Sequence, residues 1–200
     1  MRFPSTLACI LVFVFWLSYE LKKSSNHNQE KKSFLELDAE ANSVRKKPLD
    51  SLHYITIPTE SLPFFSGIDE KLTSYQETVQ MLSQKPIVNL SGFTNIDLKM
   101  EYGAANLPIL SQYDQNFTVL ARTLLQWGTR LHELGYDQEA IQVLSFGIDC
   151  QTDARGNYIL LAQLYQSQGN QSAILHLISV AETLRTSQKD GICRDLKTYL

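Results

Sequence analysis

The chain of 200 residues divides into segments with different patterns of hydrophobic and polar positions. Residues 3–19 form an uncharged apolar run, which is typical of a helix that enters a membrane. Over residues 33–47 apolar positions recur at spacings of three and four, which predicts one amphipathic helix. Residues 48–66 alternate around β-branched residues and contain prolines, so they predict an extended strap. Beyond residue 69 the periodic segments are helical, and the predicted fold class is all-α.

The apolar run of residues 3–19 predicts an N-terminal single transmembrane helix. Seventeen helical residues rise about 25 Å, against a hydrocarbon core of roughly 30 Å. A cleaved signal peptide is the alternative, but residues 17–23 lack the small residues that its cleavage site requires. A lipoprotein signal is excluded because the apolar run follows Cys9 instead of preceding it. We therefore expect a single-pass protein of the cell membrane.

The charges beside this run bear on its orientation. Four lysines, Lys22, Lys23, Lys31 and Lys32, follow the run, whereas only Arg2 and the N-terminal amine precede it. The positive-inside rule then places the large domain in the cytoplasm. The opposite orientation stays open, since very short N-terminal tails with one arginine often remain inside.

Several helices are predicted after the strap. One runs over residues 69–84, and a second runs over residues 95–102 and ends at Gly103. A third begins near Asn116, whose side chain suits a helix N-cap.

The last third of the sequence repeats itself at a constant offset. Large residues align with large ones and small residues with small ones, in the pairs Leu124 with Tyr158, Trp127 with Leu161, Gly128 with Ala162, Leu131 with Tyr165, Gly135 with Gly169, Leu144 with Ile178 and Gly147 with Ala181. This pattern predicts two antiparallel helix pairs, in which the small residues let the helices approach. Gly135 and Gly169 end the first helix of each pair, because glycine tolerates positive φ.

The offset matches the period of the tetratricopeptide repeat, a helix–turn–helix of about 34 residues. Residues 121–154 resemble one such repeat, with Gly128, Gly135 and Ala140 at its small positions, and residues 155–188 resemble a second. The family's usual proline is replaced by Thr152 and Thr186, and in the second repeat Ala173 lies one place early, with Ile174 in its slot. A closing helix is expected from Ile192, Leu196 and Leu200, because a repeat array must cover its last apolar face.

The predicted organisation therefore has six parts. They are a transmembrane anchor (1–21), a basic neck with a juxtamembrane helix (22–47), the strap (48–66), a helical N-terminal cap (67–115), two repeats within 116–188, and a C-terminal capping helix (189–200).

The resemblance also implies a groove that holds an extended peptide along the first helix of each repeat. The matching positions are Arg122, Leu125, Thr129, His132, Ile159, Gln163 and Gln166. Family members that bind chaperones clamp a terminal carboxylate with lysine and asparagine, whereas this chain has Leu125, Thr129 and Gln163 there. That class of ligand is therefore not expected.

Charge and chemistry narrow the function further. Residues 22–47 contain seven Lys and Arg against four acids, a net +3, and residues 48–200 contain ten against sixteen, a net −6. A folded part of this charge repels nucleic acid. The histidines have no metal-site spacing, and no nucleotide or nucleophile-elbow motif occurs, so no metal, cofactor, small-molecule substrate or enzymatic activity is expected. Cys150 and Cys193 predict buried free thiols.

Together with the predicted anchor, the resemblance to the tetratricopeptide repeat implies a membrane-tethered module that binds a protein or peptide partner. The alternatives are an oligomerising protein that associates through residues 33–47 and an accessory subunit of a membrane complex. A hydrolase that uses Ser43 and Lys46 is a further alternative, but one SxxK spacing is expected by chance in this composition.

Overall fold

The computed structural model describes residues 13, 15–19 and 33–200, and in this part the chain is helical, with no strand beyond one isolated bridge. The elements are α2 (Glu70–Leu82), α3 (Asn95–Tyr102), the 3-10 helix η1 (Ala104–Asn106), α4 (Leu107–Glu133), α5 (Asp137–Asp149), α6 (Arg155–Ser167), α7 (Gln171–Ala181), α8 (Lys189–Leu196) and the 3-10 helix η2 (Lys197–Tyr199). A further helix covers residues 33–43. The chain forms two compact units, of which the larger contains residues 48–94 and 107–200.

The predicted transmembrane helix requires a correction. Most of residues 3–19 lie outside the described residues, which here are Phe13 and residues 15–19. Among the residues that the structure describes, no helix is both long and apolar enough to cross a membrane. The predictions of a single-pass anchor, of a cell-membrane location and of an orientation toward the cytoplasm are therefore not supported. The weakness of the prediction is physical, since seventeen helical residues rise about 5 Å less than the hydrocarbon core measures.

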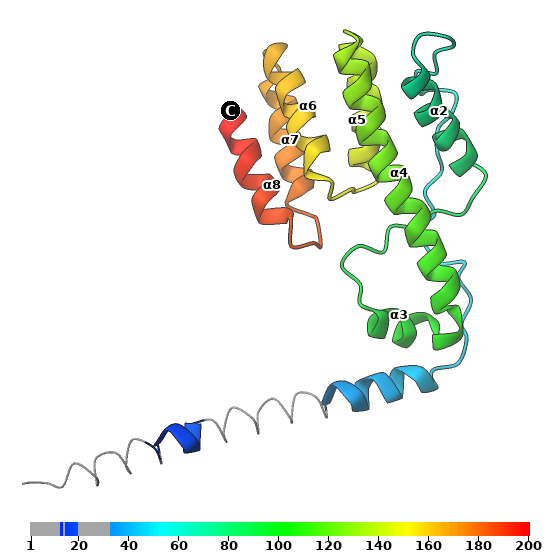
Figure 1. Ribbon diagram of the computed structural model, residues 1–200, viewed down its shortest axis with the longest axis vertical. Coiled ribbons are helices and arrows are strands. Elements are labelled where there is room, and N and C mark those ends of the chain that lie inside the picture. The colour runs from blue at the N-terminus through cyan, green and yellow to red at the C-terminus, as the bar shows by residue number, and fades with distance from the viewer. Residues whose placement is uncertain (1–12, 14, 20–32) are drawn as a thin grey trace, which may run out of the picture. The chain divides into compact units, whose positions relative to one another are not determined.

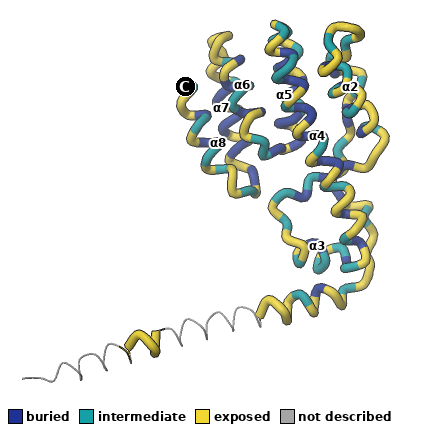
Figure 2. The backbone as a smooth tube through the Cα atoms, in the orientation of Figure 1, coloured by how far each residue is buried: buried dark blue, intermediate teal, exposed yellow. Residues whose placement is uncertain are grey.

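The larger unit is a row of packed helices. In Figure 1, α2, α4, α5, the α6–α7 pair and α8 follow one another across the view. α4 packs against both α2 and α5, while α6 packs against α5, α7 and α8. Figure 2 shows that the buried residues concentrate along the sides on which these helices face each other. The core is apolar, and its largest fully buried side chains are those of Trp127 and Tyr158.

Two helical hairpins in this unit share one spacing. Hairpin 1 is α4 with α5, and hairpin 2 is α6 with α7. The second helices begin at Asp137 and Gln171, which are separated by the repeat offset of the sequence. Each hairpin turns at a glycine in the left-handed region, with φ of 84° at Gly135 and 67° at Gly169. The predicted role of these two glycines is confirmed, because this backbone conformation favours residues without a Cβ atom.

The start of hairpin 1 differs from the prediction. α4 begins at Leu107, so Asn116 lies inside the helix and is no N-cap. Its side chain is buried, and its Nδ2 donates to the carbonyl of Pro86 at 2.8 Å. An asparagine side chain, which can cap a helix end, here instead forms a hydrogen bond with a backbone carbonyl of a neighbouring segment. The better signal for the helix start is Pro108, because proline is favoured in the first turn.

The smaller unit contains residues 95–106 together with the N-terminal part of the chain. α3 therefore does not belong to one cap with α2, although the sequence places both within residues 67–115. Three contacts explain the difference. The Lys99 amine pairs with Asp38 at 2.8 Å, the Lys47 amide donates to the carbonyl of Tyr102 at 3.0 Å, and Asn106 Nδ2 donates to the carbonyl of Lys47 at 2.7 Å.

The segment from residue 48 to 69 contains no helix. It forms an isolated antiparallel bridge from Tyr54 to Val88, and it buries the side chains of Leu52, Ile57 and Leu62. Further along, the ring of Phe64 lies 5.1 Å from that of Trp127 on α4. The segment thus adds apolar side chains to the core and packs Phe64 against α4.

Candidate functional site

The seven predicted groove residues all lie on α4 and α6, outside the fully buried core. Arg122, His132, Gln163 and Gln166 are exposed, and Leu125, Thr129 and Ile159 are half-buried. α4 and α6 are in contact. Leu125 marks this contact, because a Cβ atom on Gly156 of α6 would lie 2.9 Å from its Cδ2 atom. The structure therefore brings the two halves of the predicted groove next to each other at this point.

Two of the α4 residues use their polar atoms within hairpin 1. The Thr129 hydroxyl donates to the carbonyl of Leu125 at 2.7 Å, which is a bond within the same helix. His132 Nδ1 lies 2.6 Å from Asp137 Oδ1, so it joins the last turn of α4 to the first residue of α5. Arg122, in contrast, makes no hydrogen bond or ion pair with any other described residue. Its guanidinium is therefore a free cation on α4 among the described residues.

The two glutamines on α6 contact the end of the chain. Gln163 Nε2 donates to the hydroxyl of Tyr199 at 3.3 Å, and Gln166 Nε2 donates to the carbonyl of Tyr199 at 3.2 Å. Tyr199 belongs to η2, which continues from α8. The glutamines therefore lie at the junction of α6 with the following helix. The sequence predicts a closing helix there, but it does not predict that this helix contacts groove positions.

Three of the seven residues have side chains without a polar partner among the described residues. They are Arg122, Leu125 and Ile159, and we call them the binding face. Leu125 and Ile159 occupy the same repeat position in the two hairpins. Both side chains are apolar and half-buried. The binding face thus combines one free cation with apolar surface on two adjacent helices.

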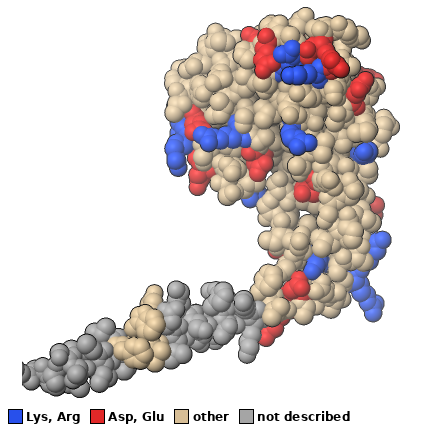
Figure 3. All heavy atoms as spheres, in the orientation of Figure 1, with Lys and Arg blue, Asp and Glu red and all other residues tan. Residues whose placement is uncertain are grey.

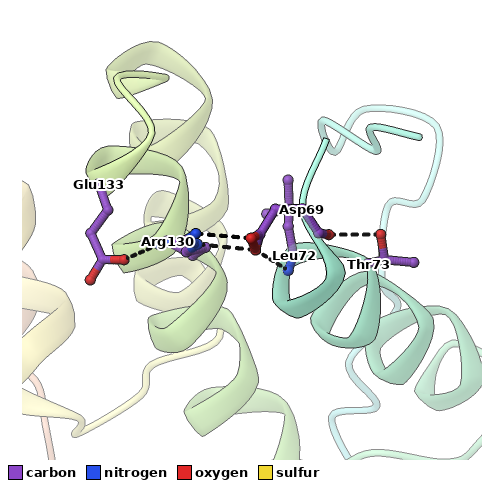
Figure 4. Close-up of polar contacts among 5 residues, drawn as sticks. All are labelled: Asp69, Leu72, Thr73, Arg130 and Glu133. Atoms are coloured by element: carbon purple, nitrogen blue, oxygen red, sulfur yellow. Dashed lines mark hydrogen bonds and ion pairs between the residues drawn. The ribbon is translucent and has the colours of Figure 1, made fainter. Parts of the chain in front are cut away.

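An ion-pair network that the sequence does not predict joins α2 to α4 of hairpin 1 (Figure 4). Arg130 donates from Nη2 to Asp69 Oδ1 at 2.8 Å and from Nε to Asp69 Oδ2 at 3.0 Å, and its Nη1 bonds Glu133 at 2.8 Å. Asp69 also caps α2 by accepting from the amide of Leu72 at 3.1 Å. An aspartate at the start of a predicted helix is a signal that could have indicated the cap, but the Arg130 partner lies 61 residues away and leaves no local signal.

These contacts shift the titration of both partners. The hydrogen bonds from Arg130, followed by the bond from the Leu72 amide, lower the pKa of Asp69 to about 2. The bonds to Asp69 and then to Glu133 raise the pKa of Arg130 above its usual value. Both groups are therefore charged at neutral pH, and the network ties α2 to the last turn of α4.

Ser43, the candidate nucleophile, makes a hydrogen bond within its own helix. Its hydroxyl donates to the carbonyl of Glu40 at 2.7 Å. Cys150 and Cys193 are free and buried, which confirms that prediction, and burial is the main reason why the pKa of Cys150 rises to about 12. In the described part of the chain, no three or more His, Cys, Asp or Glu residues are placed to hold a metal ion.

The charged surface is mixed. On the face that Figure 3 shows, Lys and Arg side chains of the described residues are interspersed with Asp and Glu. An open hollow of about 690 Å³ lies beside α8 and is lined by Glu182, Lys189, Asp190, Cys193, Arg194 and Lys197. Charges of both signs line it, which is typical of the solvated end surface of a helical array.

Comparison with known proteins adds no relative, because no family model, no curated protein and no solved structure matches this chain. A function can therefore be proposed only from the spacing of the hairpins and from the residues of the binding face.

Proposed function

We propose that residues 107–200 form a tetratricopeptide-like module that binds another protein through the exposed side of α4 and α6. The observation that carries this proposal is the equivalence of the two hairpins, which place half-buried Leu125 and Ile159 at the same point of adjacent first helices. Stacked helical hairpins form extended concave surfaces, and such repeat proteins use these surfaces for binding.

The composition of the binding face defines the chemistry of the ligand. Arg122 is exposed and free of any described partner, so it is available to a carboxylate, with which arginine forms strong bidentate hydrogen bonds. Leu125 and Ile159 offer apolar surface beside it. The ligand that fits is an extended protein segment with an acidic residue next to an apolar one. Nucleic acid fits poorly, because residues 48–200 carry a net charge of −6 from ten bases and sixteen acids.

A charge-reversal experiment tests this function. The full chain and its variant Arg122→Glu are crosslinked to bound proteins in cells, with Lys85→Glu as the matched control. Lys85 is also exposed but lies after α2, away from the binding face. We expect a defined partner whose recovery falls about tenfold or more in Arg122→Glu, as the loss of a charge-assisted pair predicts, and stays unchanged in Lys85→Glu. Equal recovery from both variants would contradict the proposal.

Self-association is the alternative function. It is favoured by the exposed apolar side chains of Phe34, Leu35 and Leu37 on the helix of residues 33–43. Light scattering on the full chain and on the variant Phe34→Ser, Leu37→Ser separates the two functions. A mass above that of one chain that falls in this variant supports self-association, and a monomeric mass in both excludes it.

A further inference from the structure

Asn89 joins the segment after α2 to the end of hairpin 1. Its Nδ2 donates to the carbonyl of Cys150 at 3.1 Å and to that of Gln151 at 2.9 Å. Its Oδ1 accepts from the amide of Ser91 at 2.9 Å, which fixes the orientation of the amide. Gln151 has a φ of 56°, the one positive φ among the described residues other than glycine. The Asn89 side chain thus holds the unusual backbone where hairpin 1 ends.

Three residues further on, the same segment contacts the end of hairpin 2. A Cβ atom on Gly92 would lie 2.7 Å from the carbonyl oxygen of Arg185 and 2.8 Å from its Cβ atom. Gly92 also has a φ of 88°, so no other residue fits well here. The Arg185 guanidinium lies 5.9 Å from the centre of the Phe93 ring, within range of a cation–π contact.

The two contact points are equivalent in the repeat. Gln151 and Arg185 are separated by the repeat offset, and each follows the second helix of its hairpin. Residues 86–93, which we call the clasp, therefore touch the same position of both hairpins in order. Asn89 contacts Gln151 and Gly92 contacts Arg185, and three residues of chain span at most about 10 Å. This short stretch therefore reaches from one hairpin to the next.

The clasp is itself held firmly on α4. The amide of Leu90 donates to Asp114 Oδ1 at 3.1 Å, and the carbonyl of Pro86 accepts from Asn116. Ile87, Val88 and Leu90 are all buried. This attachment explains why α4 extends so far before the first repeat position, since Asp114 and Asn116 lie in the extension.

We propose that the clasp is a spacer that fixes the angle and distance between the two hairpins. In a repeat array each unit contacts only its neighbours, and the curvature follows from a small rotation per repeat. A segment that binds equivalent points of both hairpins prevents this rotation from changing. The binding face spans α4 and α6, so the clasp also holds its two halves at a constant separation, a consequence that rests on the proposed function.

Hydrogen exchange on the full chain, without any partner, tests the spacer independently of the proposed function. Asn89→Asp places a carboxylate against two carbonyl oxygens and removes the donors. We expect exchange to become about tenfold faster at the amides of Gln151 and Thr152, and also at the amide of Leu184 in the second contact region. Gly92→Ala should give the reciprocal result. The added Cβ atom meets Arg185 of hairpin 2, yet exchange should also become faster at Thr152 after hairpin 1.

Asn170→Asp is the matched control. Asn170 uses its Oδ1 to cap α7, and aspartate retains that acceptor, so exchange should stay unchanged at all three amides. Asn89→Ala removes the donors without adding charge and should produce the same pattern at a smaller amplitude if Asn89→Asp does not fold. Faster exchange confined to the loop that each substitution touches would overturn the proposal.

Discussion

Hairpin 1 and hairpin 2 have the same repeat spacing but differ in the residues at equivalent positions where their helices pack. Where a helix must approach closely, Gly147 of α5 faces Asn157, since a Cβ atom on Gly147 would lie 2.2 Å from Asn157 Nδ2. At the matched positions one repeat later, the chain has Ala181 and Gly191, and a Cβ atom on Gly191 would meet nothing within 4 Å. The close approach that Gly147 makes in hairpin 1 therefore has no counterpart at Gly191, and the helices pack differently at this repeat position.

The two hairpins also differ in what covers them. α4 has 27 residues and α6 has 13, and the added length of α4 carries the clasp. Hairpin 1 is tied to α2 through Arg130 and Asp69, and hairpin 2 is tied to α8 through an ion pair between Arg155 and Asp195. Each end of the array therefore has a closing helix, as a repeat array requires, and an ion pair links each closing helix to the hairpin beside it.

The largest effect is expected at the position where hairpin 1 has Trp127 and hairpin 2 has Leu161. Both side chains are fully buried, but Trp127 also reaches Phe64 of the strap. Trp127→Leu, which copies hairpin 2, should lower the free energy of unfolding by about 2–4 kcal/mol because it leaves a cavity. Urea denaturation measures this change. Leu161→Met, which conserves volume, should cost less than about 1.5 kcal/mol, and an equal loss in both would show that the strap contact is unimportant.

A smaller effect should follow from exchanging the sizes of the pair between Gly147 and Asn157. Gly147→Ala should destabilise the fold by about 1–3 kcal/mol, since Asn157 is fully buried and cannot move aside. The double variant with Asn157→Gly removes the side chain that the new Cβ atom would meet. In that background we expect Gly147→Ala to be neutral or stabilising, because alanine is a better helix former than glycine. Additive losses in the double-mutant cycle would contradict the compensation.

The smallest effect concerns the charged tie of hairpin 1. The folded-state pKa of Asp69 is lowered to about 2, so the tie contributes stability above the unfolded-state value near 3.8. That contribution is lost as the pH falls from about 4 to 2. Asp69→Asn keeps a good N-cap for α2 but removes the ion pair. Thermal unfolding should show a lower Tm at pH 6 and a shallower fall between pH 4 and 2.

The control for this prediction is Asp50→Asn, at an exposed aspartate that forms no ion pair with another described residue. Its profile of Tm against pH should match that of the unchanged protein over this range. A parallel profile for Asp69→Asn would show that the Arg130 contact does not govern the acid limb.

The sequence predicts those features that depend on local spacing. The glycine turns at Gly135 and Gly169 and the helices near residues 70–82 and 95–102 follow from periodicity and backbone preference, and the structure has them at these places. Contacts between distant segments leave no such pattern. Asp69 and Arg130 are 61 residues apart, as are Asn89 and Cys150, and neither pair has a local signature.

The candidate site shows the same limit. Its seven positions come from the resemblance to the tetratricopeptide repeat, and the structure has them on α4 and α6. The sequence does not predict which of these side chains remain free, because the partners of Gln163 and Gln166 (Tyr199) and of His132 (Asp137) lie outside the repeat pattern. The misplaced N-cap at Asn116 has the same origin, since its partner Pro86 lies 30 residues before it.

The most direct test of a binding face on the first helices compares Leu125 with Leu175. Leu175 lies on α7, the second helix of hairpin 2, and its side chain is 55% exposed. The side chain of Leu125 on α4 is half-buried and therefore less exposed. The protein is labelled throughout with photo-leucine in cells, irradiated, and analysed by mass spectrometry for the leucines that carry partner peptides. Binding through the first helices predicts partner adducts at Leu125 and none at Leu175, although Leu175 is the more accessible apolar side chain. Adducts at Leu175 with none at Leu125 would contradict it.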